Sequence, residues 1–108
     1  MDLQHTPKFD KHLNKYLDET DINLFKTAVS YLKNSMPLPE SYDDHQLRYQ
    51  KKGIRDFHLQ SDTVVVYYLI REKSITFIDV GPHSLLFKVK KDYLSSSVKR
   101  LSNRYKNN

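Results

Sequence analysis

The sequence predicts an α+β domain that runs as a helical hairpin, then a β-sheet, then a basic C-terminal helix. Two observations predict this class. Apolar residues recur at helical spacing over residues 8–36, whereas residues 45–80 contain short runs that alternate or are wholly apolar. The chain has 108 residues, which is the size of one domain, so residues 1–108 are expected to form a single unit in which residues 88–108 are a basic extension.

The first half of the chain predicts a short strand followed by two helices. Residues 3–6 form a short edge strand that stops at Pro7. A first amphipathic helix starts at Lys8, with apolar positions at Phe9, Leu13, Tyr16 and Leu17. Residues 18–21 are a polar break that holds capping residues. A second helix follows and ends before Pro37, with its apolar stripe at Ile22, Phe25, Val29, Leu32 and Met36.

The second half predicts four strands of which one is central. Residues 45–50 and 54–60 are strands joined by the turn 51–53, and in the second strand Asp56 and His58 share the polar face. Residues 63–70 are apolar on both faces, which is typical of a central strand. Residues 75–80 form the next strand, which Gly81-Pro82 breaks, so His83 is expected on a loop. From Asp92 onward the spacing of apolar residues favours a helix.

Charge and composition exclude several classes of protein. The chain has no cysteine, which excludes thiolate zinc sites and cysteine nucleophiles, and no apolar run approaches the roughly 20 residues that span a bilayer. No signal pattern opens the chain, so a cytoplasmic protein without membrane contact is expected. Residues 1–87 carry a net charge of −1 and residues 88–108 a net charge of +6. Either a phosphate-binding element or a solvated basic helix explains the extension.

Three histidines and one aspartate near strand ends are candidates for proton transfer, namely His45, His58, Asp62 and His83. The separations of the histidines are 13 and 25 residues, which match no compact zinc motif, so no metal and no cofactor are expected. Structural alternatives stay open, because a strand histidine is often only a packed polar group and an aspartate in a tight turn is what turn geometry selects.

The chain also resembles a known family, the YafQ branch of the RelE/ParE toxin superfamily. The words that carry the resemblance occur in order from Phe9 to Phe87 and include Leu38-Pro39, Asp44-His45-Gln46-Leu47, Gly53-Ile54-Arg55-Asp56-Phe57-His58, Asp62, Val65-Val66-Tyr67 and Gly81-Pro82-His83-Ser84-Leu85-Leu86-Phe87. The resemblance implies a helical hairpin on a twisted, mainly antiparallel sheet. It also implies a ribosome-dependent endoribonuclease of a bacterial toxin–antitoxin pair, with a cognate antitoxin, the ribosome and mRNA as partners.

The resemblance places the family's site on His45, His58, Asp62 and His83, with Asp56 as support. Metal-independent RNA cleavage by the 2′-hydroxyl needs a base, an acid and positive charge for the developing phosphorane. His83 is the expected acid, and Asp62 or His58 the expected base. The available phosphate partners are Arg55, Lys51, Lys52 and His45, and Phe87 either stacks on a base or packs in the core.

One position departs from the family pattern. Asp79 stands two residues before the glycine of the last word, where family members usually have an arginine. A carboxylate near the cleaved phosphate is unfavourable, so Asp79 predicts a weak nuclease unless Arg55 or a lysine of the 51–52 turn replaces the charge. The alternative function is a toxin of this fold with little or no nuclease activity that acts by binding a protein, such as its antitoxin or a gyrase-type target.

Overall fold

The fold is a five-stranded sheet with helices against one face and at one end. The computed structural model describes residues 1–48, 50–60 and 62–88. Its elements in chain order are β1 (Asp2–His5), α1 (Pro7–Tyr16), α2 (Glu19–Lys33), the 3₁₀ turn η1 (Glu40–Tyr42), β2 (His45–Gln46), β3 (Ile54–His58), β4 (Thr63–Ile70), β5 (Ser74–Pro82) and α3 (His83–Lys88). The α+β class is confirmed, while the helix expected from Asp92 lies outside the described residues.

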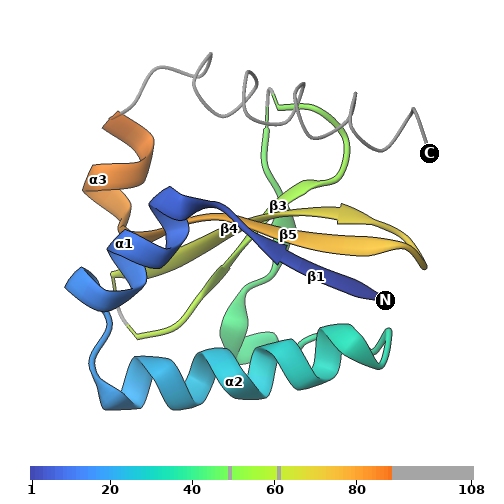
Figure 1. The fold of residues 1–108 in the computed structure, drawn as a ribbon, viewed down its shortest axis with the longest axis horizontal. Helices are drawn as coiled ribbons and strands as arrows, with labels where there is room; N and C mark the ends of the chain where they lie inside the picture. The colour runs from blue at the N-terminus through green and yellow to red at the C-terminus, as the bar shows by residue number, and fades with distance from the viewer. Residues whose placement is uncertain (49, 61, 89–108) are drawn as a thin grey trace.

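The strands lie in the order β1-β5-β4-β3-β2, so β4 is central as the sequence predicts (Figure 1). The edge strand β1 pairs in parallel with β5, and the other neighbours are antiparallel. A bulge shifts the β4–β5 register, since Val66 pairs with Asp79 while Tyr67 pairs with Phe77. Across the strands, one row of residues therefore runs His45, Asp56, Val66, Asp79.

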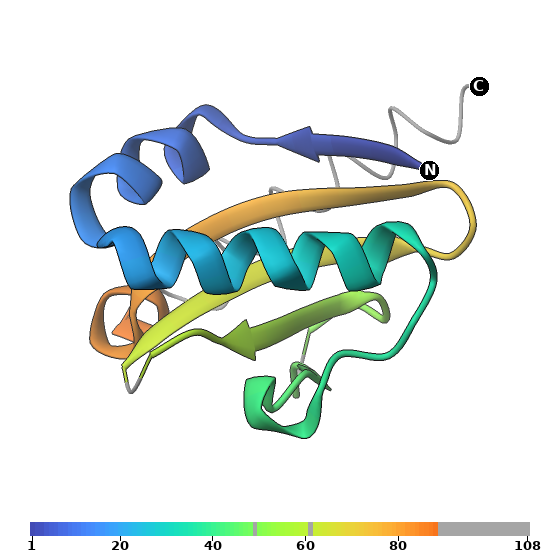
Figure 2. The same ribbon diagram turned by 90° about the horizontal axis from the view of Figure 1, so that it is seen from below.

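The two faces of the sheet bury separate apolar clusters. Helix α2 crosses one face (Figure 2), and α1 packs near the β1–β5 edge. The larger cluster lies under the helices and includes Phe9, Ala28, Leu32, Phe57, Val65, Tyr67, Phe77 and Val80. The smaller cluster is formed by Ile54, Val64, Val66, Tyr68, Ile78 and Leu86, on the opposite face. The described helices include none with the length and apolar character needed to cross a bilayer.

Both long helices begin at side-chain caps, although the sequence indicates only the cap at residues 18–21 and places the start of the first helix at Lys8 instead of Pro7. Thr6 caps α1 by accepting a hydrogen bond from the Phe9 N–H, and Pro7 occupies the first helical position, where its missing N–H costs nothing. Asp18 and Asp21 form a reciprocal capping box at the start of α2. The helical hairpin is thus set by local hydrogen bonds as well as by its apolar stripes.

The predicted helix end at Met36 is wrong. Helix α2 ends at Lys33, because Asn34 turns its side-chain amide onto the Ser30 carbonyl and Ser35 adopts a left-handed backbone with φ of 55°. Met36 lies beyond the helix and its side chain is exposed.

The predicted limits of four strands also differ from the structure. Strand β1 is Asp2–His5 instead of 3–6, β3 ends at His58 instead of at residue 60, and β2 and β5 differ most. Strand β2 holds only His45 and Gln46, because the Gln46 amide bonds the Lys51 carbonyl and the Gly53 N–H in place of further ladder pairs. Strand β5 is not broken at Gly81-Pro82 but continues to Pro82, which pairs with Thr63. Strand β1 ends opposite Phe77, so the missing N–H of Pro82 faces no described strand.

Gly53 is predicted to be intolerant of a side chain. Its φ is 100°, and a Cβ there would lie 2.8 Å from Tyr68 Cε1 and 2.9 Å from the Leu69 oxygen. We expect Gly53→Ala to lower the free energy of unfolding by about 1–3 kcal/mol. Denaturant titration checks this, with Lys52→Ala in the same turn as an exposed control expected to change it by less than about 0.5 kcal/mol. Equal stability of the two variants would contradict the prediction.

Candidate active site

The sequence-predicted histidines lie where β3, β4 and β5 meet their turns. His58 is the last residue of β3, Asp62 lies in the turn before β4, and His83 is the first residue of α3. His58 pairs with Val64, which pairs with Gly81, so His58 and Gly81 are about 10 Å apart across β4. The structure therefore gathers His58, Asp62 and His83 at one end of the sheet.

His45 joins this group through Asp56, its partner in the β2–β3 ladder. The His45 and His58 ring centroids are 6.3 Å apart. His45 Nδ1 lies 2.7 Å from the Asp43 carbonyl oxygen and 3.2 Å from Asp56 Oδ1, and His58 Nε2 lies 3.9 Å from Asp43 Oδ2. A carbonyl oxygen only accepts, so His45 Nδ1 carries the hydrogen and the neutral ring has its lone pair on Nε2.

Asp56 is the buried centre of this cluster. Its side chain is 4% exposed, and Oδ1 accepts no hydrogen bond from the described residues, since the His45 N–H is directed at the Asp43 carbonyl. Burial raises the pKa of the Asp56 carboxyl, and the positive charges of His45 and His58 oppose that shift only in part. A buried carboxyl beside two imidazoles is a candidate for exchanging protons with them.

The predicted loop position of His83 is wrong, because His83 opens a short helix. Its backbone N–H donates to the Asp62 carbonyl oxygen over 2.9 Å, and the His83 side chain is exposed. This single bond fixes the start of α3 to the β3–β4 turn, so the two candidates at positions 62 and 83 are held side by side. Phe87 lies in α3, and its side chain is outside the described part of the structure.

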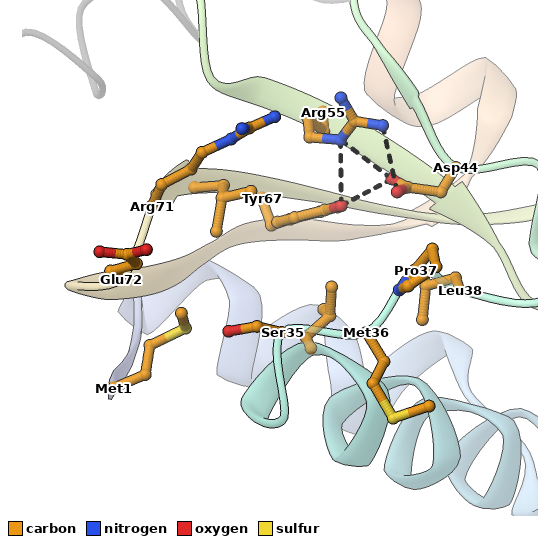
Figure 3. Close-up of a pocket in the computed structure, with 12 residues that line it drawn as sticks. Met1, Ser35, Met36, Pro37, Leu38, Asp44, Arg55, Tyr67, Arg71 and Glu72 are labelled. Carbon is orange, nitrogen blue, oxygen red and sulfur yellow. Dashed lines mark hydrogen bonds and ion pairs between the residues drawn. The ribbon is translucent and has the colours of Figure 1, made fainter.

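Arg55 belongs to a separate network on the helix-covered face of the sheet. Its Nη2 lies 3.1 Å from Asp44 Oδ2 and its Nε 3.3 Å from the Tyr67 hydroxyl, which donates to Asp44 Oδ1 over 2.6 Å (Figure 3). Burial, reinforced by Asp44, raises the pKa of the Tyr67 hydroxyl. The network links Asp44 and Arg55, the residues next to His45 and Asp56, on the helix-covered face of the sheet. The structure thus does not bring Arg55 to the histidines, and Lys51 and Lys52 are exposed in the 51–53 turn.

Asp79 is buried and paired with a histidine that sequence reasoning missed. His12 Nδ1 on α1 lies 2.6 Å from Asp79 Oδ1, which also accepts from the Val80 N–H over 2.8 Å. The two side chains are 13% and 4% exposed. The pairing joins residues 67 positions apart, and no local spacing in the sequence signals it. The Asp79 carboxylate, which the sequence predicts to repel the substrate phosphate, is therefore paired with the His12 imidazole.

The described residues contain no group of three or more histidine, aspartate or glutamate side chains placed to hold a metal ion. Imidazoles and carboxylates make up the cluster. His45, His58 and His83 offer ring nitrogens that can donate or accept a proton, and Asp56 and Asp62 offer carboxylates. This arrangement suits acid–base catalysis.

Comparisons with known proteins point to one family. The family described as "Bacterial toxin of type II toxin-antitoxin system, YafQ" matches residues 1–88. An mRNA interferase toxin YafQ of Escherichia coli B is 33% identical over 88 residues, which cover 80% of this chain and 95% of the relative.

Solved structures agree with the sequence comparisons. A crystal structure of the Escherichia coli DinJ–YafQ complex matches with a TM-score of 0.68 and 33% identity, covering 80% of this chain and 97% of that one. A metal-bound toxin from Helicobacter pylori matches with a TM-score of 0.69 and 28% identity, covering 80% and 98%.

The raised pKa of Asp56 predicts a pH-dependent stability difference. The folded protein holds this proton more tightly than the unfolded chain, so native stability falls as the pH rises from the ordinary value of 3.8 through the raised one. Each tenfold increase in proton affinity on folding costs about 1.4 kcal/mol of stability at neutral pH. We expect Asp56→Asn to raise the Tm at pH 7 and to match the unaltered protein near pH 3.8. Thermal melts at both pH values check this, with the exposed Asp2→Asn as control. A lower Tm for Asp56→Asn at pH 7 would contradict it.

Proposed function

Because the chain belongs to the YafQ family of bacterial type II toxins, we propose that it arrests translation by cutting messenger RNA on the ribosome. Its curated relatives of that name are mRNA interferases, and the chain is an mRNA-cleaving toxin of the same kind. The observation that supports the proposed site is the pair His45 and His58 beside the buried Asp56 carboxylate, with Asp62 and His83 at the same end of the sheet. The proposal names the ribosome as the place of cleavage and assigns a role to each side chain.

The reaction we propose needs no metal. The ribose 2′-oxygen forms a bond to the adjacent phosphorus, the bond from phosphorus to the 5′-oxygen breaks, and a cyclic phosphate and a free 5′-hydroxyl result. A base removes the proton from the 2′-hydroxyl, and an acid gives a proton to the departing 5′-oxygen. General acid–base assistance of this kind is worth about 10²–10⁴-fold in rate.

His83 is the proposed acid. It is exposed at the start of α3, and its backbone bond to Asp62 holds it over the turn that follows β3. An exposed imidazole on a fixed backbone can meet a leaving oxygen that arrives from solvent. Its protonated form supplies both the proton and a positive charge.

His58 is the better placed of the two base candidates. Asp62 is exposed in its turn, whereas His58 is half-buried at the end of β3 and shares the polar face with Asp56. When His58 takes a proton, the negative charge of Asp56 stabilises the resulting imidazolium. His45 lies on the far side of Asp56 and, with its Nε2 directed away from the Asp43 carbonyl, contacts the phosphate or relays a proton.

The antitoxin is the second proposed partner. A relative is solved in complex with DinJ, and a free nuclease toxin needs a neutralising protein. We place an acidic antitoxin segment over the His45, His58 and His83 cleft or around the helical hairpin. The remaining substrate contacts proposed from the sequence, namely Lys51, Lys52, Arg55 and Phe87, lie outside the histidine group or outside the described side chains.

Replacing His83 tests the proposed acid. We expect His83→Ala to abolish growth arrest and mRNA cleavage on induction, because the leaving oxygen loses its proton donor, while folding and antitoxin binding persist. Primer extension on transcripts and co-purification with the product of an adjacent small reading frame measure the two effects. His5→Ala, at an exposed histidine of β1, is the matched control. Undiminished cleavage by a folded His83→Ala protein would refute the assignment.

Replacing Asp79 tests whether its carboxylate faces the substrate. We expect Asp79→Arg to destabilise the domain by about 3–5 kcal/mol, because it leaves His12 without its partner and buries the arginine charge without a counter-charge. Thermal unfolding measures this, and Asp2→Arg makes the same charge change at an exposed site. If Asp79→Arg instead keeps its Tm and cuts mRNA at least tenfold faster, the carboxylate opposes the phosphate as the sequence alone suggests.

A further inference from the structure

A polar cavity lies at the opposite end of β3 from His58. It has a volume of about 470 Å³ and is lined by Gln46, Lys52, Gly53, Arg55, Tyr68, Leu69, Ile70 and Arg71. We call this cavity the basic pocket, because three of its lining residues are cations and none is a carboxylate. Gly53 and His58 are five residues apart along the strand, or about 17 Å. A ligand in the basic pocket is therefore distinct from a phosphate undergoing cleavage at His58.

Most of the cationic side chains in the basic pocket have no carboxylate partner among the described residues. Arg55 uses Nε and Nη2 on Asp44 and Tyr67, and Arg71 extends toward Arg55 (Figure 3). Within the described part of the chain, neither the Lys52 nor the Arg71 side chain has a hydrogen bond or an ion pair. Because like charges brought together repel one another, an anion between them is favourable.

A fourth cation lies beside one of the residues that line the basic pocket. Lys51 Nζ lies 5.7 Å from the centre of the Tyr68 ring, and Tyr68 lines the basic pocket. Residues 1–87 carry a net charge of −1, so this gathering of cations is local and not a consequence of an overall basic domain. This local excess of cations therefore favours the binding of an anionic ligand in the basic pocket.

We propose that the basic pocket binds a phosphodiester group of RNA, at a subsite separate from the cleavage site. Guanidinium groups bind phosphate oxygens through paired N–H donors, and ammonium groups add point charge. RNA is favoured over an acidic peptide because β3 carries the pocket at one end and His58 at the other, so one RNA strand along β3 reaches both. The inference rests on the proposed function and adds Arg71 to its substrate contacts.

Arg71→Gln tests the subsite, with Lys73→Gln as the matched control. Both residues are exposed in the turn between β4 and β5, and both changes remove one positive charge, but only Arg71 lines the basic pocket. Binding is measured to vacant ribosomes and, separately, to a short single-stranded RNA, over a series of salt concentrations. We expect Arg71→Gln to reduce the slope of log K against log salt by about 0.7–0.9, the value for one lost phosphate contact. Lys73→Gln should leave the slope unchanged.

Comparing vacant ribosomes with the short single-stranded RNA shows which RNA supplies the bound phosphate. A reduced slope on vacant ribosomes supports ribosomal RNA as the ligand, and a reduced slope on the short RNA supports the message strand. Arg71→Lys, which keeps the charge, should restore the slope. Unchanged slopes for Arg71→Gln on both partners overturn the proposal, as does an equal reduction by Lys73→Gln. Weakened binding to the antitoxin alone also overturns it, because the pocket would then serve a peptide.

Failure of this proposal is distinguishable from failure of the proposed function. The slopes are read from binding and mRNA cleavage is read separately, so the two results are independent. If the unaltered protein cuts mRNA and Arg71→Gln binds RNA with the same salt slope as the unaltered protein, the subsite proposal is wrong and the proposed nuclease activity is kept. If the unaltered protein binds with the expected slope and does not cut mRNA, the nuclease is wrong and the subsite stands.

Discussion

Each carboxylate that this small domain buries needs a donor, because an unpaired buried charge costs several kcal/mol. Two such carboxylates fasten the helices to the sheet. Asp21, at the start of α2, accepts from the backbone N–H and the side-chain amide of Gln60, which leads into the β3–β4 turn. Asp79 on β5 is joined to His12 on α1. The helical hairpin is thus held at both of its parts by polar contacts that also fix the segments carrying Asp62 and His83.

Asp56 is the exception that gives the site its chemistry. One of its oxygens is buried without a hydrogen bond from the described residues, and the cost appears as a raised pKa of its carboxyl. The rest of the structure offsets this loss of stability, because the Asp44–Arg55–Tyr67 network holds β2 and β3 together on the other face of the sheet. The same sheet therefore has a hydrogen-bonded polar network on its helix-covered face and, on the other face, a carboxylate with one buried oxygen that accepts no hydrogen bond from the described residues.

The parts of the fold that depend on local pattern were predictable, and the parts that depend on distant partners were not. The wholly apolar run of β4 and the capping residues at Asp18 were sufficient to place the central strand and the helix break. The extent of β5 through Pro82 depends on where β1 stops, which no local pattern reveals. The residue types of the site were predictable, because histidines near strand ends are visible in sequence. The partner of Asp79 was not, since His12 meets it only through the packing of α1 on β5.

The parallel pairing of β1 with β5 bears on how the toxin is made. Asp2–His5 pair with residues 74–77, so the first strand to leave the ribosome has no partner until most of the domain has been synthesised. His83 is made later still, and its backbone bond to Asp62 cannot form earlier. A nascent chain therefore has neither the complete five-stranded sheet nor the Asp62–His83 bond until these residues have been made. The order of the strands delays completion of the sheet until residues 74–77 have been synthesised.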